Sequence, residues 1–180
     1  KDGILSREEA KTAYAAASHA FEAGDFVTAS RELARADELA PNDVVLSSAL
    51  EAVLKTDDAL LGMSLVERAS LRGTTLATKA EPVRTKFSSR VGRLGAFCEP
   101  DSACEITIDG VHAPEGKMRY VTPGTHRVIA TGYGAVHEEE VTVLAGEEKK
   151  AVYLNQAPPT AAPVPPPAPL EKAPPPAPPG

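Results

Sequence analysis

The stretch that decides the fold is VGRLGAFCEPDSACEITIDG, which runs from Val91 to Gly110. Before it, apolar residues recur every three to four positions, which is the spacing of an amphipathic helix. From about Arg93 the hydrophobic period changes to two, which is typical of strands, and Val, Thr, Ile and Gly replace the earlier abundance of Ala, Leu and Glu. The sequence therefore predicts a helical part followed by a β part, with the boundary near residue 92.

The composition excludes several classes of protein. The chain has 180 residues, of which 42% are hydrophobic and 24% charged, and its net charge is −6. This acidic balance argues against a nucleic-acid binder, which would show a basic face. No apolar run approaches the ~18 residues that a membrane helix needs. Because the chain begins at Lys1 and stops inside a proline tract, we expect it to be a piece of a longer protein.

Twelve of the 17 prolines lie in the last 24 residues, 157–180. This Pro/Ala composition predicts a disordered tail of the polyproline II type, which would reach roughly 75 Å if fully extended. The tail contains only two charged residues, Glu171 and Lys172, and cannot build a core.

Five helices are expected before the boundary. A capping box at Ser6 and Glu9 predicts the start of the first helix, and Gly24 predicts its end. The others are expected over about residues 26–40, 43–56, 58–72 and 75–90, with Pro82 starting or kinking the last. Gly62 lies within the fourth helix, where a close helix–helix contact or simple tolerance would explain it.

The first two helices resemble a tetratricopeptide repeat. Counted back from Pro41 as the terminal proline, the 34-residue pattern places its other positions at Gly24, Phe26, Ala29, Leu33 and Ala36. The small residues would let the two helices approach, and Leu33 would fill the gap between them. The resemblance covers one repeat, because the next unit, residues 44–77, retains only Leu50 and Leu54 in register.

Six short strands are expected beyond the boundary, over residues 94–98, 104–108, 118–121, 125–131, 139–144 and 149–154. Their spacing of 8–12 residues is typical of a small antiparallel sandwich. This part resembles a PEGA domain through Ile106-Thr-Ile-Asp-Gly110, Thr122-Pro-Gly-Thr-His-Arg-Val128, Gly132-Tyr133, Glu140-Val-Thr-Val143 and Gly146-Glu147. The expected fold is therefore α+β in series, with a TPR-like helical domain at 1–91, a PEGA-like antiparallel β-sandwich at 92–156 and a disordered proline-rich linker at 157–180.

Cys98 and Cys104 are the only cysteines, and a short turn separates them. If they face each other across a hairpin mouth, a disulfide would stabilise the fold by about 2–2.5 kcal/mol and imply an oxidising compartment. The alternative is two free thiols in a cytosolic protein. A redox-active pair is disfavoured, because the spacing is not Cys-x-x-Cys, and zinc would need two further ligands.

No residue pattern predicts catalysis, a metal site or a cofactor. The cluster His137-Glu138-Glu139-Glu140 lies on an expected strand, where successive side chains point to opposite faces and cannot converge on one ion. We expect the remaining histidines, His19, His112 and His126, to be packed or on the surface. Ser47, Ser48 and Ser64 have no His/Asp partner in a recognisable pattern.

The repeat resemblance implies a partner-binding groove on the first and third helices. Its candidate residues are Tyr14, Ser18, Phe21, Ser48, Ala52 and Lys55. The alternative, which the sequence favours, is that Tyr14 and Phe21 pack in the core, because such grooves usually need about three repeats to hold a peptide.

Together the two resemblances imply a bacterial cell-envelope protein, periplasmic or on the cell surface, in which a proline-rich linker often leads to a membrane helix or a surface attachment. We expect a non-catalytic scaffold whose helical part docks a protein partner and whose β part is a spacer or surface-contact module. One alternative is a module that binds peptidoglycan or polysaccharide. Sugar sites usually present flat aromatic side chains, and the tyrosines of the β part are only Tyr120, Tyr133 and Tyr153. Of these, Tyr133 is expected to fill the sandwich corner. Another alternative is the ectodomain of an envelope sensor.

Overall fold

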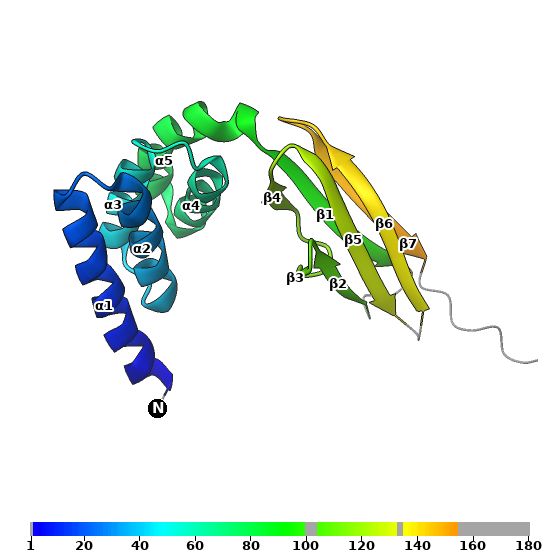
Figure 1. Cartoon of the computed structure of the whole chain (residues 1–180), viewed down its shortest axis with the longest axis horizontal. Coiled ribbons are helices and arrows are strands. Elements are labelled where there is room, and N and C mark those ends of the chain that lie inside the picture. Colours follow the sequence, from blue (N-terminus) through cyan, green and yellow to red (C-terminus); the bar gives the residue numbers. More distant parts are fainter. Residues whose placement is uncertain (1, 100–103, 133–134, 155–180) are drawn as a thin grey trace, which may run out of the picture.

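The computed structural model describes residues 2–99, 104–132 and 135–154, with only the backbone for residues 2–5 and 154. The tail predicted at 157–180 and the role predicted for Tyr133 lie outside these residues. The helices are α1 (Asp2–Glu22), α2 (Phe26–Leu39), α3 (Asp43–Val53), α4 (Ala59–Arg72) and α5 (Thr74–Phe87), followed by a 3₁₀ turn at Ser88–Arg90. The described strands all follow the helices, so the prediction of α and β in series is confirmed. The two parts form the arms of an arch (Figure 1).

Local capping explains where the helices begin and end. Gly24, with a φ of 76°, ends α1 in the left-handed conformation that glycine adopts without steric cost. The side chain of Asp25 accepts a hydrogen bond from the Thr28 N–H at the start of α2. Asn42 and Asp58 cap α3 and α4 in the same way. The boundaries predicted at these residues are confirmed.

The predicted start of the first helix was wrong, and the structure excludes one of the two roles predicted for Pro82, the start of the last helix. The first helix begins at Asp2 rather than at Ser6. A serine caps a helix only where its own backbone leaves the helical conformation, and Ser6 lies inside the helix. No proline precedes Ser6 to interrupt the helix there. Pro82 lies inside α5, eight residues after its start at Thr74, so it does not begin that helix.

Large apolar side chains fill the helical core, and a glycine lets two of its helices pack closely. The largest fully buried side chains of the helical core are Leu46, Leu50, Val53, Leu65, Val66, Val83 and Phe87. A Cβ atom added at Gly62 would lie 2.5 Å from Cδ2 of the Phe87 ring. The glycine in α4 is therefore required by the approach of α5, as one of the two sequence interpretations held.

A buried carboxylate ties α2 to α4. The Asp37 side chain is 0% exposed and accepts hydrogen bonds from both terminal nitrogens of the Arg72 guanidinium, at 2.6 and 2.9 Å. It also accepts from the Asn42 N–H at 3.0 Å and lies 3.5 Å from Nη1 of Arg68. This network fixes the turn between α2 and α3 against the fourth helix.

The β part consists of two sheets. Its strands are β1 (Gly92–Glu99), β2 (Glu105–Ile108), β3 (Val111–His112), β4 (Arg119–Val121), β5 (Gly124–Gly132), β6 (Ala135–Val143) and β7 (Glu148–Leu154). The strand orders are β4-β1-β7 and β3-β2-β5-β6. Buried side chains from both sheets form one core, to which Leu94, Ile106, Val128 and Val143 contribute.

The all-antiparallel prediction was wrong at one pair, and β3 was not predicted. β1 pairs with β7 in parallel, with Arg93 opposite Glu148 and Glu99 opposite Leu154. The first and last strands are neighbours in space but not in sequence. A pattern of short strands and turns does not specify such a pairing, because only hairpin neighbours leave a local signal.

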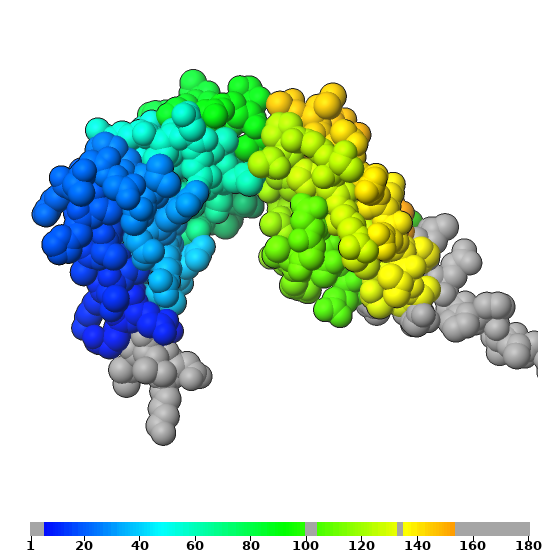
Figure 2. All heavy atoms as spheres, in the orientation of Figure 1, coloured from blue at the N-terminus to red at the C-terminus, as the bar shows by residue number. Residues whose placement is uncertain are grey.

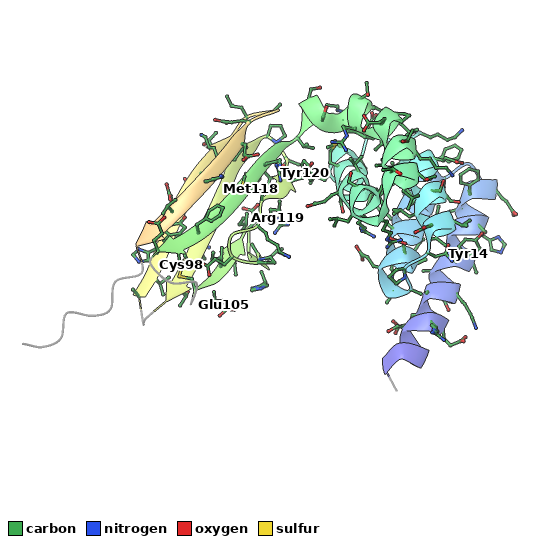
Figure 3. The ribbon with its side chains drawn as sticks, turned by 180° about the vertical axis from the view of Figure 1, so that it is seen from behind. Tyr14, Cys98, Glu105, Met118, Arg119 and Tyr120 are labelled. Atoms are coloured by element: carbon green, nitrogen blue, oxygen red, sulfur yellow. A yellow bond between two sulfur atoms is a disulfide. The ribbon has the colours of Figure 1, made fainter. Side chains whose placement is uncertain are left out.

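Cys98 and Cys104 form a disulfide, with their Cα atoms 6.3 Å apart. This confirms the predicted pairing, but the predicted hairpin mouth was wrong. β1 and β2 belong to different sheets, so the bond fastens the end of β1 to the residue that precedes β2. The disulfide therefore links the two sheets at the end of the β arm (Figure 3).

Strand β4 packs against the helical arm. Tyr120 packs against the helical core, and the Arg93 guanidinium lies 5.5 Å from the centroid of its ring. A hollow lined by α4 residues and by Pro114, Lys117, Met118 and Arg119 separates the arms beside this contact. Figure 2 shows the concave inner side of the arch at this point.

Candidate functional site

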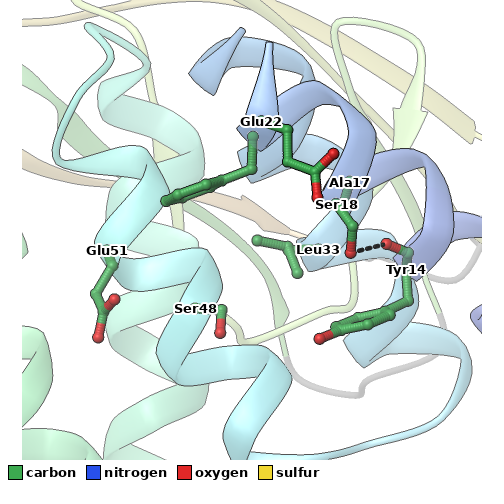
Figure 4. A pocket seen from close by; sticks show the side chains of 8 residues that line it. Tyr14, Ala17, Ser18, Glu22, Leu33, Ser48 and Glu51 are labelled. Carbon is green, nitrogen blue, oxygen red and sulfur yellow. Dashed lines mark hydrogen bonds between the residues drawn. The ribbon is translucent and has the colours of Figure 1, made fainter. Parts of the chain in front are cut away.

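A hollow of about 250 Å³ opens on the helical arm among α1, α2 and α3 (Figure 4). Four of the six residues predicted to form a partner-binding groove are part of its lining. The lining residues are Tyr14, Ala17, Ser18, Phe21, Glu22, Leu33, Ser48 and Glu51.

The rings of Tyr14 and Phe21 are exposed at this hollow. Tyr14 is 47% exposed and Phe21 is 42% exposed, so the alternative that both pack in the core was wrong. They lie seven residues apart on α1, which places them on nearly the same face of the helix, about 10 Å apart along its axis. Ala17, which is fully buried, lies between them along α1 and lines the same hollow.

The floor of the hollow is apolar and its walls carry two hydroxyls. Leu33 of α2 is buried beneath the rings, which agrees with the gap-filling role predicted for it. Ser18 Oγ donates to the Tyr14 carbonyl at 3.1 Å, and Ser48 Oγ donates to the Val44 carbonyl at 3.1 Å. Since each hydroxyl proton is already engaged, both oxygens offer only acceptor capacity to a ligand.

Two carboxylates give the hollow an acidic character. Glu22 and Glu51 are both exposed, and neither has an ion-pair or hydrogen-bond partner among the described residues. The sequence analysis missed both, although a spacing signal existed. Glu22 lies four residues after Ser18, and Glu51 lies three residues after Ser48, which are the separations of neighbours on one helix face.

Lys55 and Ala52 do not line the hollow. The Lys55 ammonium lies 4.7 Å from the centroid of the Phe26 ring, and that ring meets Phe21 edge to face at 5.2 Å. Lys55 therefore makes a cation–π contact with the Phe26 ring of this aromatic pair. Ala52 is fully buried in the helical core.

The β arm holds one buried histidine in close contact with a carboxylate. His126 is 6% exposed; its Nδ1 lies 2.7 Å from Oδ2 of Asp109 and its Nε2 lies 2.7 Å from the Thr122 carbonyl oxygen. The ring is thereby held between a side-chain oxygen and a backbone oxygen. The hydrogen bond from His126 lowers the pKa of Asp109. The pair joins the turn after β2 to the start of β5, which is a structural role and agrees with the packed histidine expected there.

The other titratable residues of the β arm do not converge on a site. Glu139 accepts a hydrogen bond from the Tyr153 hydroxyl at 3.2 Å, and the His137 ring stacks on that tyrosine. Burial of Tyr153, together with the Glu139 charge, raises the pKa of its phenol. Glu138 instead pairs with Arg127 on the opposite face of β6. Within the part of the chain that the structure describes, no group of three His, Cys, Asp or Glu side chains could hold a metal ion.

In comparisons with known proteins, no family model, no curated protein and no solved structure matches this chain. None of the helices in the described ranges is long and apolar enough to cross a membrane.

Proposed function

We propose that this chain is a non-catalytic scaffold of the bacterial cell envelope, in which the α1–α3 hollow docks a protein partner. The observation that carries the proposal is the exposure of Tyr14 and Phe21 over an apolar floor. Half-exposed aromatic rings around a concave surface are typical of places where a partner buries a side chain. The resemblance of α1 and α2 to a tetratricopeptide repeat supports the same face as the binding surface.

The β arm would act as a spacer or a surface-contact module, as its resemblance to a PEGA sandwich suggests. The disulfide supports an oxidising compartment, such as the periplasm or the cell surface, because such bonds rarely persist in the cytosol. The alternative of a carbohydrate-binding module has less support. Tyr120 packs against the helices and Tyr153 is buried, so neither ring offers an exposed platform for a sugar.

The test is capture from a bacterial envelope extract on the tagged full chain, with purified sacculi and solubilised proteins scored separately. We expect a discrete protein to be retained, and to be lost from the double variant Tyr14→Ala, Phe21→Ala. The matched control is Leu71→Ala, which removes an 83% exposed side chain outside the hollow. Retention on sacculi that soluble glycan fragments compete away, with no protein captured, would contradict the proposal.

A further inference from the structure

We propose that the occupant of the hollow is a proline-rich segment with one lysine, namely residues 163–172 of a second copy of this chain. This inference rests on the proposed function and names the partner of the same site. It is carried by the spacing of the two exposed rings, by the two unpaired carboxylates and by the register of the prolines in the tail sequence.

The spacing of the rings fits a polyproline II helix. Tyr14 and Phe21 are about 10 Å apart along the axis of α1, since seven residues rise 1.5 Å each. A polyproline II helix repeats every three residues and rises about 9 Å in that distance. Prolines three residues apart can therefore meet the two rings in turn. Aromatic grooves that bind Pro-x-x-Pro segments use this match, and the ligand has little conformational entropy left to lose.

The tail sequence has this register. Every third residue from Pro163 falls on one face of a polyproline II helix, and the residues on that face are Pro163, Pro166, Pro169, Lys172, Pro175 and Pro178. The single lysine of the tail thus shares a face with five prolines. The single acid, Glu171, belongs to a different face of the same helix.

The acidic lining of the hollow suits a segment that carries a lysine. With Pro166 at Tyr14 and Pro169 at Phe21, the next position on the same face is Lys172, beyond the ring of Phe21. Glu22, at the end of α1, and Glu51 of α3 both line the hollow and make it acidic. Both carboxylates lack an ion-pair partner among the described residues, so either can pair with the lysine ammonium.

A second copy is the source of the segment because the arms of the arch separate the two ends. α1 forms the outer side of the helical arm, and β7, after which the tail begins, lies on the outer side of the β arm (Figure 1). The tail of the same molecule would have to pass from the β arm to the helical arm to reach the hollow, whereas the tail of a neighbouring molecule can enter it directly. Such a contact is heterologous, so it would join copies head to tail.

The first measurement is the fluorescence anisotropy of a labelled peptide with the sequence of residues 157–180. The protein is the full chain whose own tail carries Pro166→Ala, Pro169→Ala and Lys172→Ala, so that it does not compete. We expect saturable binding that weakens at least tenfold with Tyr14→Ala and is unchanged with Leu71→Ala. A peptide of the same composition with its prolines and lysine moved out of the three-residue register should bind at least tenfold more weakly.

The second measurement is sedimentation of the unmodified full chain at concentrations above the dissociation constant of the peptide. Concentration-dependent association that Tyr14→Ala abolishes supports the second copy as the source. Peptide binding without self-association would overturn that source, and equal binding of the shuffled peptide, or none of either, would overturn the occupant altogether. If the peptide fails while capture of an envelope protein still requires Tyr14 and Phe21, only this inference fails and the proposed function stands. Far-UV circular dichroism of each variant shows whether it is folded.

Discussion

Replacement of Asp37 by alanine tests whether the buried carboxylate holds the helical arm together. The substitution leaves the Arg72 guanidinium without the two hydrogen bonds of 2.6 and 2.9 Å, and leaves the Asn42 N–H without its acceptor. Breaking a buried ion pair by removing one partner costs about 3–5 kcal/mol. Arg68 and Arg72 retain 20% and 22% of their side-chain exposure and keep Glu38 and Asp43 as neighbours, so we expect the lower end, about 3 kcal/mol.

The assay is urea denaturation of the full chain, followed at 222 nm, where the helices dominate the signal. The matched control is Glu38→Ala, which removes an exposed partner of Arg68 and should cost less than about 1 kcal/mol. Asp37→Asn keeps one acceptor oxygen and should fall between the two. A loss below about 1 kcal/mol for Asp37→Ala would refute the reasoning, because the network would then contribute no more than a surface pair.

The remaining predictions concern packing, acid and the disulfide. Gly62→Ala should lower the free energy of unfolding by about 1–2 kcal/mol in spite of its gain in helix propensity, because its Cβ would lie 2.5 Å from the Phe87 ring; a stabilised variant would contradict this. The lowered pKa of Asp109 stabilises the fold fully above about pH 4, and this contribution is lost as the pH falls through that pKa, so the difference in unfolding free energy from Asp109→Asn should shrink in acid between pH 5.5 and 2, not stay constant. Exported protein, denatured without reductant, should show no free thiol on labelling, and Cys98→Ser with Cys104→Ser should cost about 2–2.5 kcal/mol; two reactive thiols would remove the argument for an oxidising compartment.

The helix boundaries could be predicted from the sequence where a single residue determines them. Asp25, Asn42 and Asp58 cap helices with their own side chains, and Gly24 supplies a left-handed backbone. Such signals act over a few residues, so they can be recognised in the sequence without knowledge of the fold. The start of α1 was missed because a capping box is only one of several ways to begin a helix.

The features that could not be predicted depend on contacts between distant segments. The parallel pairing of β1 with β7 and the separation of β1 from β2 follow from the assembly of two sheets, which the alternation of residues does not encode. The buried site of Asp37 likewise depends on two arginines more than 30 residues away.

Four of the eight lining residues were candidates from the repeat resemblance, and three of them, Tyr14, Ser18 and Phe21, share one face of α1. Of the candidates on α3, Ser48 lines the hollow, whereas the Lys55 ammonium lies over the Phe26 ring. The exposure of the rings was not predictable, since an aromatic residue on an apolar stripe is buried or exposed according to which helices cover it.

The most direct test of the docking surface is photo-cross-linking from within the hollow. A benzophenone amino acid replaces Phe21 in one full-length variant and the exposed Leu71 in another, and each is irradiated in a bacterial envelope preparation. The account predicts one discrete protein adduct from position 21, either a partner or a second copy of the chain, and none of that size from position 71. The same adducts from both positions, or adducts from position 71 alone, would contradict it.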